Sequence, residues 1–181
     1  MRNYEERAID FIQQIYPYIV GEMTPWGVRA SVKTFNAKYN RKVQVNHGIA
    51  RIAMITSDYV VKFDYDPYEV AVVGGGEAEI RMYEIAKREG YAYLFAKVTR
   101  YEYCGRRFYI MPRIRGISEN NWYHADHFMT DEENDWCDRH NLSDLHCNNY
   151  GFRNGKVCIV DYACICGETD YGSTSCEISS T

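Results

Sequence analysis

The feature that most restricts the fold of this chain is a pair of acidic positions around a short hairpin near the C-terminus. Asp144 is followed five positions later by Asn149. The pair Asn154-Gly155 is typical of a hairpin turn, and the apolar run after it, 157–160, ends at a second acid, Asp161. The pattern predicts a hairpin whose second strand leads directly into a carboxylate.

These residue types, in this order, suit phosphoryl transfer. One carboxylate orients the attacking hydroxyl, while an amide oxygen and a second carboxylate hold Mg²⁺ on the phosphates. Mg²⁺ prefers hard oxygen ligands, keeps several waters and takes few ligands from the protein. The alternative interpretation is structural: Asn148, Asn149 and Asn154 would be turn residues, and Asp161 would cap a strand.

The same stretch resembles the catalytic loop and metal-binding motif of the protein-kinase-like superfamily. Its form, Asp-x-His-x-x-Asn, is closer to atypical, bacterial and phage-type kinases than to the His-Arg-Asp form. The resemblance implies an α+β, two-lobed fold with a truncated C-lobe and with ATP and Mg²⁺ in the cleft. It makes Asp144 the catalytic base, Asn149 and Asp161 the metal ligands, and His146 a contact of the γ-phosphate.

Upstream, three short runs have strand character: 42–45, 51–55 and 59–63. In the family, the turn after the first strand covers the nucleotide phosphates. Gly48 is the single glycine there, where the family has several. The resemblance makes Lys62, in the third run, the clamp on the α- and β-phosphates. The alternation of side chains along a strand does not decide whether Lys62 faces the interior or solvent. Val61 and Phe63 lie on the opposite face from Lys62, and apolar residues fit either face of a sheet.

The clearest helix spans 77–89 and is followed by Gly90, a usual residue just after a helix. The resemblance implies that Glu79 on this helix pairs with Lys62 and orients it. Charged side chains on helices usually face solvent, so the alternative interpretation of each glutamate is an exposed surface residue. The competing candidates on the same helix are Glu77 and Glu84.

Two further strands are predicted at 94–99 and 107–111. Residues 109–116, which overlap the end of the second strand, resemble a kinase hinge. In that register the Pro112 carbonyl accepts from the adenine amino group and the Ile114 N–H donates to the ring. Proline has no N–H, and this register needs none at that position. An ordinary edge-strand proline is the alternative.

We expect one minimal kinase-like domain with three parts: an N-terminal helix and connector (1–42), an N-lobe (43–112), and a reduced C-lobe with a tail (113–181). The first helix is predicted over 3–20, ending at Pro17 or Gly21, and 21–42 is predicted as a connector with one irregular strand. In the C-lobe, a helix is predicted over 131–140, capped by Thr130 or Asp131. The Ser- and Thr-rich tail after Asp170 is predicted to be mobile.

Composition excludes several classes of protein. The 181 residues, 46% hydrophobic and 15% aromatic, are enough for a folded core. A net charge of −4 gives no sign of a nucleic-acid-binding surface. No apolar stretch approaches membrane-spanning length, and the polar start is not a signal peptide. We therefore expect a cytoplasmic protein (in the host cytoplasm if the chain is phage-encoded) with seven reduced cysteines.

The expected function is transfer of the ATP γ-phosphate to a hydroxyl, on a protein Ser, Thr or Tyr. One alternative is a pseudokinase or nucleotide-binding regulatory module, favoured by the single glycine, by Ala163 in place of the motif's glycine, and by the missing substrate platform. Another is a small-molecule kinase, disfavoured because the C-lobe lacks the substrate-binding insert.

A separate hypothesis is a structural zinc, with ligands among His124, His127, Cys137 and His140.

Overall fold

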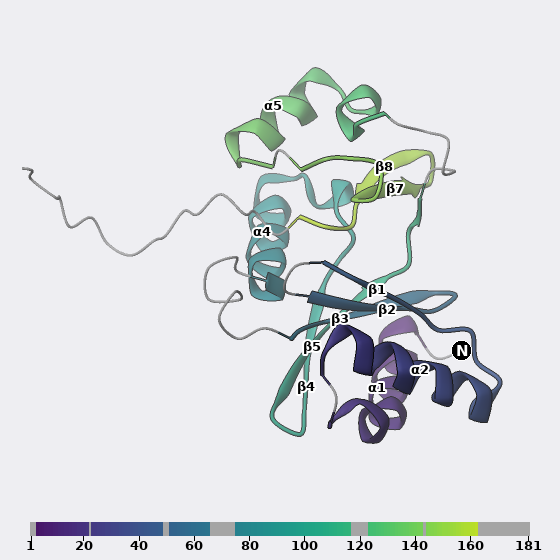
Figure 1. Cartoon of the computed structure of the whole chain (residues 1–181). Coiled ribbons are helices and arrows are strands. Elements are labelled where there is room, and N and C mark those ends of the chain that lie inside the picture. Colours follow the sequence, from purple (N-terminus) through teal and green to yellow (C-terminus); the bar gives the residue numbers. More distant parts are fainter. Residues whose placement is uncertain are drawn as a thin grey trace, which may run out of the picture.

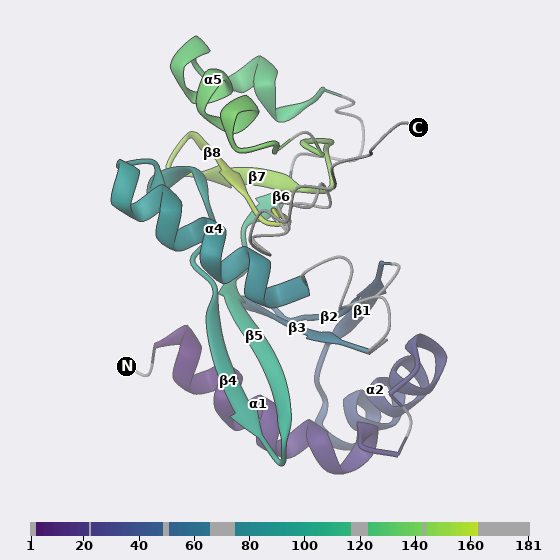
Figure 2. The same cartoon turned by 90° about the vertical axis from the view of Figure 1, so that its left-hand side faces the viewer.

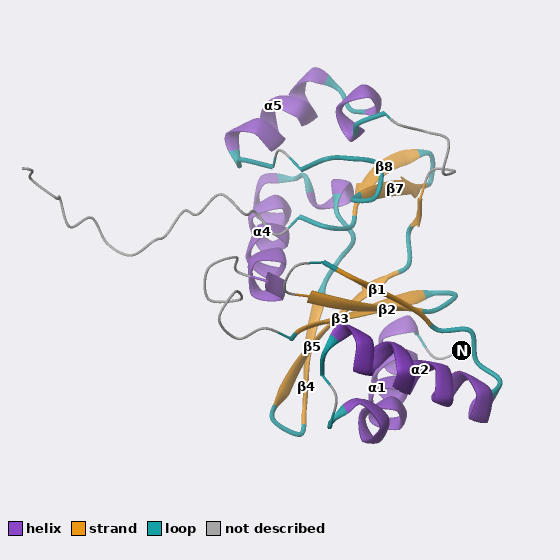
Figure 3. Ribbon diagram, viewed as in Figure 1, coloured by secondary structure: helices purple, strands orange, loops and turns teal. Residues whose placement is uncertain are grey.

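The computed structural model describes residues 3–21, 23–48, 51–65, 75–116, 123–142 and 144–162. Helices and antiparallel strands are mixed along the chain (Figure 3). In order, the elements are α1 (Tyr4–Ile19), α2 (Pro25–Tyr39), β1 (Gln44–His47), β2 (Arg51–Ile55), β3 (Tyr59–Asp64), α4 (Gly75–Glu89), η1 (Ala92–Leu94), β4 (Thr99–Tyr103), β5 (Arg106–Pro112), β6 (Arg115–Gly116), η2 (Ala125–Phe128), α5 (Asp131–Arg139), β7 (Tyr150–Arg153) and β8 (Lys156–Ile159).

The strands form two antiparallel sheets. The larger has the order β1-β2-β3-β5-β4, and the smaller has the order β6-β7-β8. In Figure 1, α1 and α2 lie against one face of the larger sheet, while α4, α5 and the smaller sheet lie on its other side. Figure 2 shows α4 between the two sheets. Both faces of the larger sheet are therefore covered.

Two hydrophobic cores follow from this arrangement. One lies between the α1–α2 pair and the larger sheet, and includes Phe11, Phe35 and Phe63. The other lies among α4, α5, η1 and the smaller sheet, and includes Phe95 and Trp136. The two cores give the chain the α+β, two-lobed architecture expected from the sequence. None of the described helices is long and apolar enough to cross a membrane.

The prediction for residues 21–42 was wrong, because α2 occupies most of this segment. The Thr24 hydroxyl accepts a hydrogen bond from the Gly27 N–H at 3.2 Å, and Pro25 stands at the start of the helix, where its missing N–H costs nothing. The helix buries an apolar stripe in the sheet, namely Val28, Val32 and Phe35. Pro17 likewise does not end α1, which continues to Ile19.

The strand predicted at 94–99 is also corrected. Residues 92–94 form a 3₁₀ turn, and β4 begins only at Thr99. Between them, Phe95 makes an isolated parallel bridge with Ile159, and the Ala96 N–H donates to the Ile159 carbonyl at 2.9 Å. The apolar residues here join the second core instead of extending the larger sheet.

Other local predictions are confirmed. The strands at 51–55 and 59–63, the helix at 77–89 and the helix capped by Thr130 are all present within one or two residues. Asn154 and Gly155 have φ values of 55° and 78°, as a tight hairpin between β7 and β8 requires. Ala163 and the tail after Asp170 lie outside the described residues.

Candidate active site

Lys62 lies on β3 and points away from the α1–α2 core. Its neighbours Val61 and Phe63 are buried in that core, so alternation places Lys62 on the opposite face, toward α4. The residue is only 7% exposed. A buried ammonium group is stable only when it is paired and hydrogen-bonded.

Glu79 on α4 supplies the partner of Lys62. The Lys62 Nζ lies 2.7 Å from the Glu79 Oε1, and Glu79 is fully buried. The other two glutamates on this helix are placed differently. Glu77 contacts Arg100 and accepts from the Tyr109 hydroxyl, both at 3.2 Å, and the Glu84 side chain is 62% exposed. The structure therefore distinguishes Glu79 from its competitors by burial.

Asp161 follows β8 and approaches the same ion pair from the other lobe. The Lys62 Nζ donates to the Val160 carbonyl at 2.8 Å and lies 3.8 Å from the Asp161 Oδ1. The segment after β8 thus lies against the Lys62 side chain of the larger sheet. Lys62, Glu79 and Asp161 form one cluster, which we call the ionic cluster.

Arg51 is a fourth member of the ionic cluster, and the sequence interpretation missed it. Its guanidinium lies 2.9 Å from the Glu79 Oε1 and donates to the Asp161 carboxylate. Burial alone would lower the pKa of Arg51, but the two carboxylates raise it. The available signal was register: Ala53 is opposite Lys62, so Arg51, two residues before Ala53, lies on the same face of the sheet as Lys62.

The two cations determine the charge state of Asp161. Burial by itself would raise the pKa of this carboxyl, but the charges of Lys62 and Arg51 and the hydrogen bond from Arg51 lower it to about 2. Its side chain remains 41% exposed. Asp161 is therefore an ionised carboxylate, accessible from solvent, at neutral pH.

This shift predicts a pH dependence of stability. The pKa of about 2 in the folded protein lies below the ordinary aspartate value of about 4, so ionised Asp161 stabilises the fold above about pH 4. That contribution is lost as the pH falls through about 2. We expect the difference in unfolding free energy between wild type and Asp161→Asn to shrink over this interval, as measured by urea titration. A difference in unfolding free energy that stays constant between about pH 6 and about pH 2 would contradict the lowered pKa.

Asn149 is fixed beside Asp161 by the backbone. The Asn149 carbonyl accepts from the N–H groups of Val160, at 2.7 Å, and Asp161, at 3.3 Å. The Asn149 Nδ2 donates to the Asp144 carbonyl at 2.9 Å. These contacts connect the loop before β7 to the segment after β8. They also orient the Asn149 amide, since its nitrogen end is occupied.

Asp144 and His146 lie on the exposed side of this loop. The Asp144 side chain is 61% exposed, and that of His146 is 44% exposed. The His146 Nε2 lies 3.4 Å from the Asp144 Oδ1, and the His146 Nδ1 faces the Asn148 N–H at 3.2 Å. Asp144 is thus connected to the ionic cluster through Asn149, and its carboxylate is open to an incoming group.

The donor set near Asp161 fits a magnesium ion. Asn149 is nearly buried, and no described residue donates to its Oδ1. The ionised Asp161 adds a carboxylate, so two hard oxygen donors come from adjacent segments. Few protein ligands are normal for Mg²⁺, which keeps its remaining waters.

Residues 109–116, proposed from the sequence to bind adenine, are described in full, whereas the β1–β2 turn is described only in part. The Arg113 N–H donates to the Asp58 carbonyl at 3.0 Å, which anchors the segment between Pro112 and Ile114 to the β2–β3 turn. No described residue accepts from the Ile114 N–H. Gly48 is exposed and donates to the Arg51 carbonyl at 2.9 Å. Residues 49 and 50 lie outside the described part of the chain.

The zinc hypothesis is not supported where it can be examined. Within the described ranges, which include all four proposed ligands, no group of three or more His, Cys, Asp or Glu residues is arranged to hold a metal. The His140 Nε2 instead faces Glu89 at 3.1 Å, and its ring packs on Trp136. Cys137 is buried in the second core.

No family model and no curated protein matches the sequence. Among solved structures, the chain is similar to the ternary complex of APH(2'')-IIa with streptomycin and ATP. The match has 13% identity and a TM-score of 0.38, and covers 73% of this chain and 69% of that chain. A likeness this distant carries no functional argument, so function has to be argued from the site.

Proposed function

We propose that this protein binds Mg·ATP between its lobes and transfers the γ-phosphate to a hydroxyl acceptor. The observation that carries the proposal is the ionic cluster. Lys62 on β3 contacts a fully buried glutamate on α4 and, at the same time, the segment that carries Asp161. A buried lysine paired with a buried glutamate, beside a carboxylate whose pKa is strongly lowered, is the kind of arrangement found at functional sites.

The proposal gives each residue a role that suits its position. Lys62 and Arg51 are positive charges held together in the ionic cluster, where they would bind phosphate oxygens. Glu79 orients both. Asn149 and Asp161 would hold Mg²⁺, which neutralises charge on the phosphates when bound. Asp144, with His146 beside it, would accept the proton of the attacking hydroxyl.

Adenine would be bound by the segment after β5. The Pro112 carbonyl and the Ile114 N–H offer one acceptor and one donor, and the anchoring of Arg113 holds the segment in place. Gly48, at the start of the β1–β2 turn, would allow the turn to lie over the phosphates.

A second candidate function is a nucleotide-binding regulatory module without transfer activity. One observation favours it: the Asp161 carboxylate contacts two cations, Arg51 and Lys62. Those contacts have to be rearranged before Asp161 meets a metal. If the rearrangement does not occur, the site binds nucleotide weakly or without turnover.

Binding and turnover together test the proposal. We expect calorimetry to show Mg²⁺-dependent ATP binding, and Asp161→Asn to weaken it about tenfold or more because a ligand charge is lost. Glu84→Gln, an exposed neutralisation on α4, is the matched control and should bind as wild type does. Transfer of phosphate from γ-labelled ATP is then measured with two fractions of a cell lysate as acceptors, one containing the macromolecules and one containing the small molecules. Binding without transfer supports the second candidate, and absence of binding refutes both.

A further inference from the structure

In one long stretch of the chain, every charged residue is basic. Residues 23–57 contain no Asp or Glu, although the whole chain has a net charge of −4. The stretch forms α2, β1 and β2, and all of its basic residues before β2 are exposed. The end of the molecule formed by α2 and β1 is therefore positive, because its exposed charges are Arg29, Lys33, Lys38, Arg41 and Lys42.

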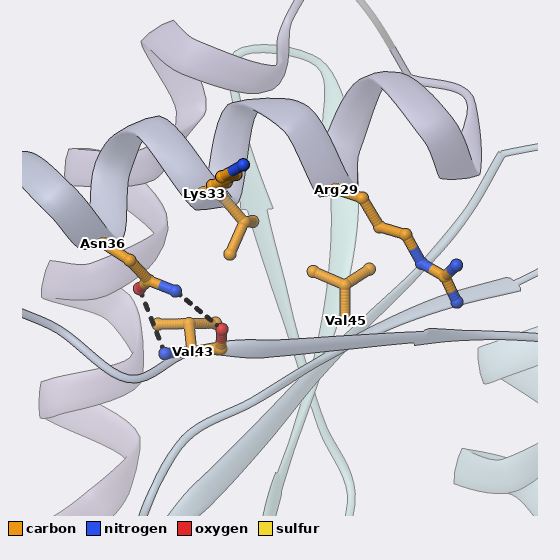
Figure 4. A pocket seen from close by; sticks show the side chains of 6 residues that line it. Arg29, Lys33, Asn36, Val43 and Val45 are labelled. Carbon is orange, nitrogen blue, oxygen red and sulfur yellow. Dashed lines mark hydrogen bonds between the residues drawn. The ribbon is translucent and has the colours of Figure 1, made fainter.

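A groove runs between α2 and β1 at this positive end. It has a volume of about 220 Å³, and Figure 4 shows Val45 pointing from the strand toward the helix that carries Arg29 and Lys33. Neither basic side chain has a carboxylate partner among the described residues; Arg29 lies instead over the ring of Trp26, at 5.6 Å, and that tryptophan is 74% exposed. The full lining is Arg29, Val32, Lys33, Asn36, Val43 and Val45.

The backbone of β1 is open along this groove. β1 is an edge strand, and the Asn36 amide bonds both backbone groups of Val43, at 2.8 and 3.0 Å. Val43 therefore turns its N–H and C=O away from β2. These groups alternate along an antiparallel strand, so Val45 and His47 also turn theirs outward. No described residue bonds to them there.

We propose that this edge binds an acidic, extended segment of a partner protein, added as a sixth strand beside β1. Strand addition uses main-chain bonds for affinity and alternate side chains for specificity. The added strand would bond to Val45 and His47, and its acidic side chains would face Arg29 and Lys33. Asn36 already occupies the pairing position at Val43 and would mark the end of the added strand.

The open edge also favours a peptide over a nucleic acid. It presents N–H donors and C=O acceptors together, and a peptide backbone has matching groups of both kinds. A phosphodiester backbone has acceptors but no donors. The groove faces α2, whereas Lys62 points from the other face of the sheet toward α4. The proposal is therefore independent of phosphotransfer.

Fluorescence anisotropy with a labelled peptide tests the charge requirement. The probe is a peptide of about eight alternating Glu and Val residues, a usual strand length, at about 50 mM salt. The double variant Arg29→Glu/Lys33→Glu should bind it at least about tenfold more weakly. Arg106→Glu/Arg107→Glu makes the same charge change at the exposed start of β5 and should leave binding unchanged. Equal binding by both double variants, or no binding by wild type, overturns the proposal.

Two further comparisons test strand addition itself. Val45→Pro removes an outward N–H and leaves the β1–β2 ladder intact, so it should weaken binding while the melting temperature stays close to that of wild type. A probe with alternate amides N-methylated applies the same test without changing the protein. Full binding of the methylated probe contradicts strand addition. Preferential binding of a single-stranded oligonucleotide that displaces the peptide would overturn the proposal in favour of nucleic acid.

Discussion

Asp144→Asn is expected to reduce phosphotransfer by about 10²–10⁴-fold while leaving the affinity for Mg·ATP nearly unchanged. The side chain is exposed and its one described ionic neighbour is His146, at 3.4 Å. It makes no described contact with Lys62, Glu79 or Asp161. Loss of a base that touches the acceptor should therefore lower kcat and not the nucleotide Kd. Calorimetry with Mg·ATP, beside a turnover assay, measures both quantities.

A matched control for this variant is Asp138→Asn, which neutralises an exposed aspartate on α5. It should change neither quantity. Two results would contradict the assigned role. Wild-type turnover by Asp144→Asn would show that the carboxylate is not the base. A large loss of nucleotide affinity would show that Asp144 acts on the nucleotide and not on the acceptor.

Glu79→Ala is expected to have the largest effect on stability, about 3–5 kcal/mol of unfolding free energy. The glutamate is fully buried and pairs with Lys62 and Arg51, at 2.7 and 2.9 Å. Its removal leaves two positive charges in a largely buried site without their shared carboxylate. Urea denaturation followed by circular dichroism measures the loss.

The control is Glu84→Ala on the same helix, where the side chain is 62% exposed and the expected change is within about 0.5 kcal/mol. If Glu79→Ala does not fold, Glu79→Gln retains the shape and removes only the charge. A loss below about 1 kcal/mol for both Glu79 variants would mean that the cluster is solvated and contributes little, as surface pairs do.

The parts of the fold that sequence predicted well are those with local signals. The Asn154-Gly155 turn, the Thr130 cap and Gly90 after α4 each act within a few residues. α2 was missed although Thr24 and Pro25 are a helix start, because scattered Lys and Arg residues obscured its apolar stripe. A helix that packs on a sheet needs only a narrow buried face, and here three residues supply it.

Chemistry and spacing in the sequence singled out Asp144, Asn149 and Asp161, and the structure connects their segments by hydrogen bonds, while their roles stay predictions. The direction of Lys62 was not predictable, because both faces of the larger sheet are covered and apolar neighbours fit either side. Arg51 had no motif at all. A cation at the start of a strand looks like a surface residue until the pairing of β2 with β3 places it beside Lys62.

The ionic cluster joins parts of the chain that are far apart in sequence, and this has a consequence for folding. Arg51 and Asp161 are separated by 110 positions, and Lys62 and Val160 by 98. The core between α1, α2 and the larger sheet uses only residues before 113. Contacts across long loops form late, because loop closure costs entropy before the contact is made. During synthesis, the first core can therefore assemble before the ionic cluster exists, and the cluster is complete only when the last hairpin docks.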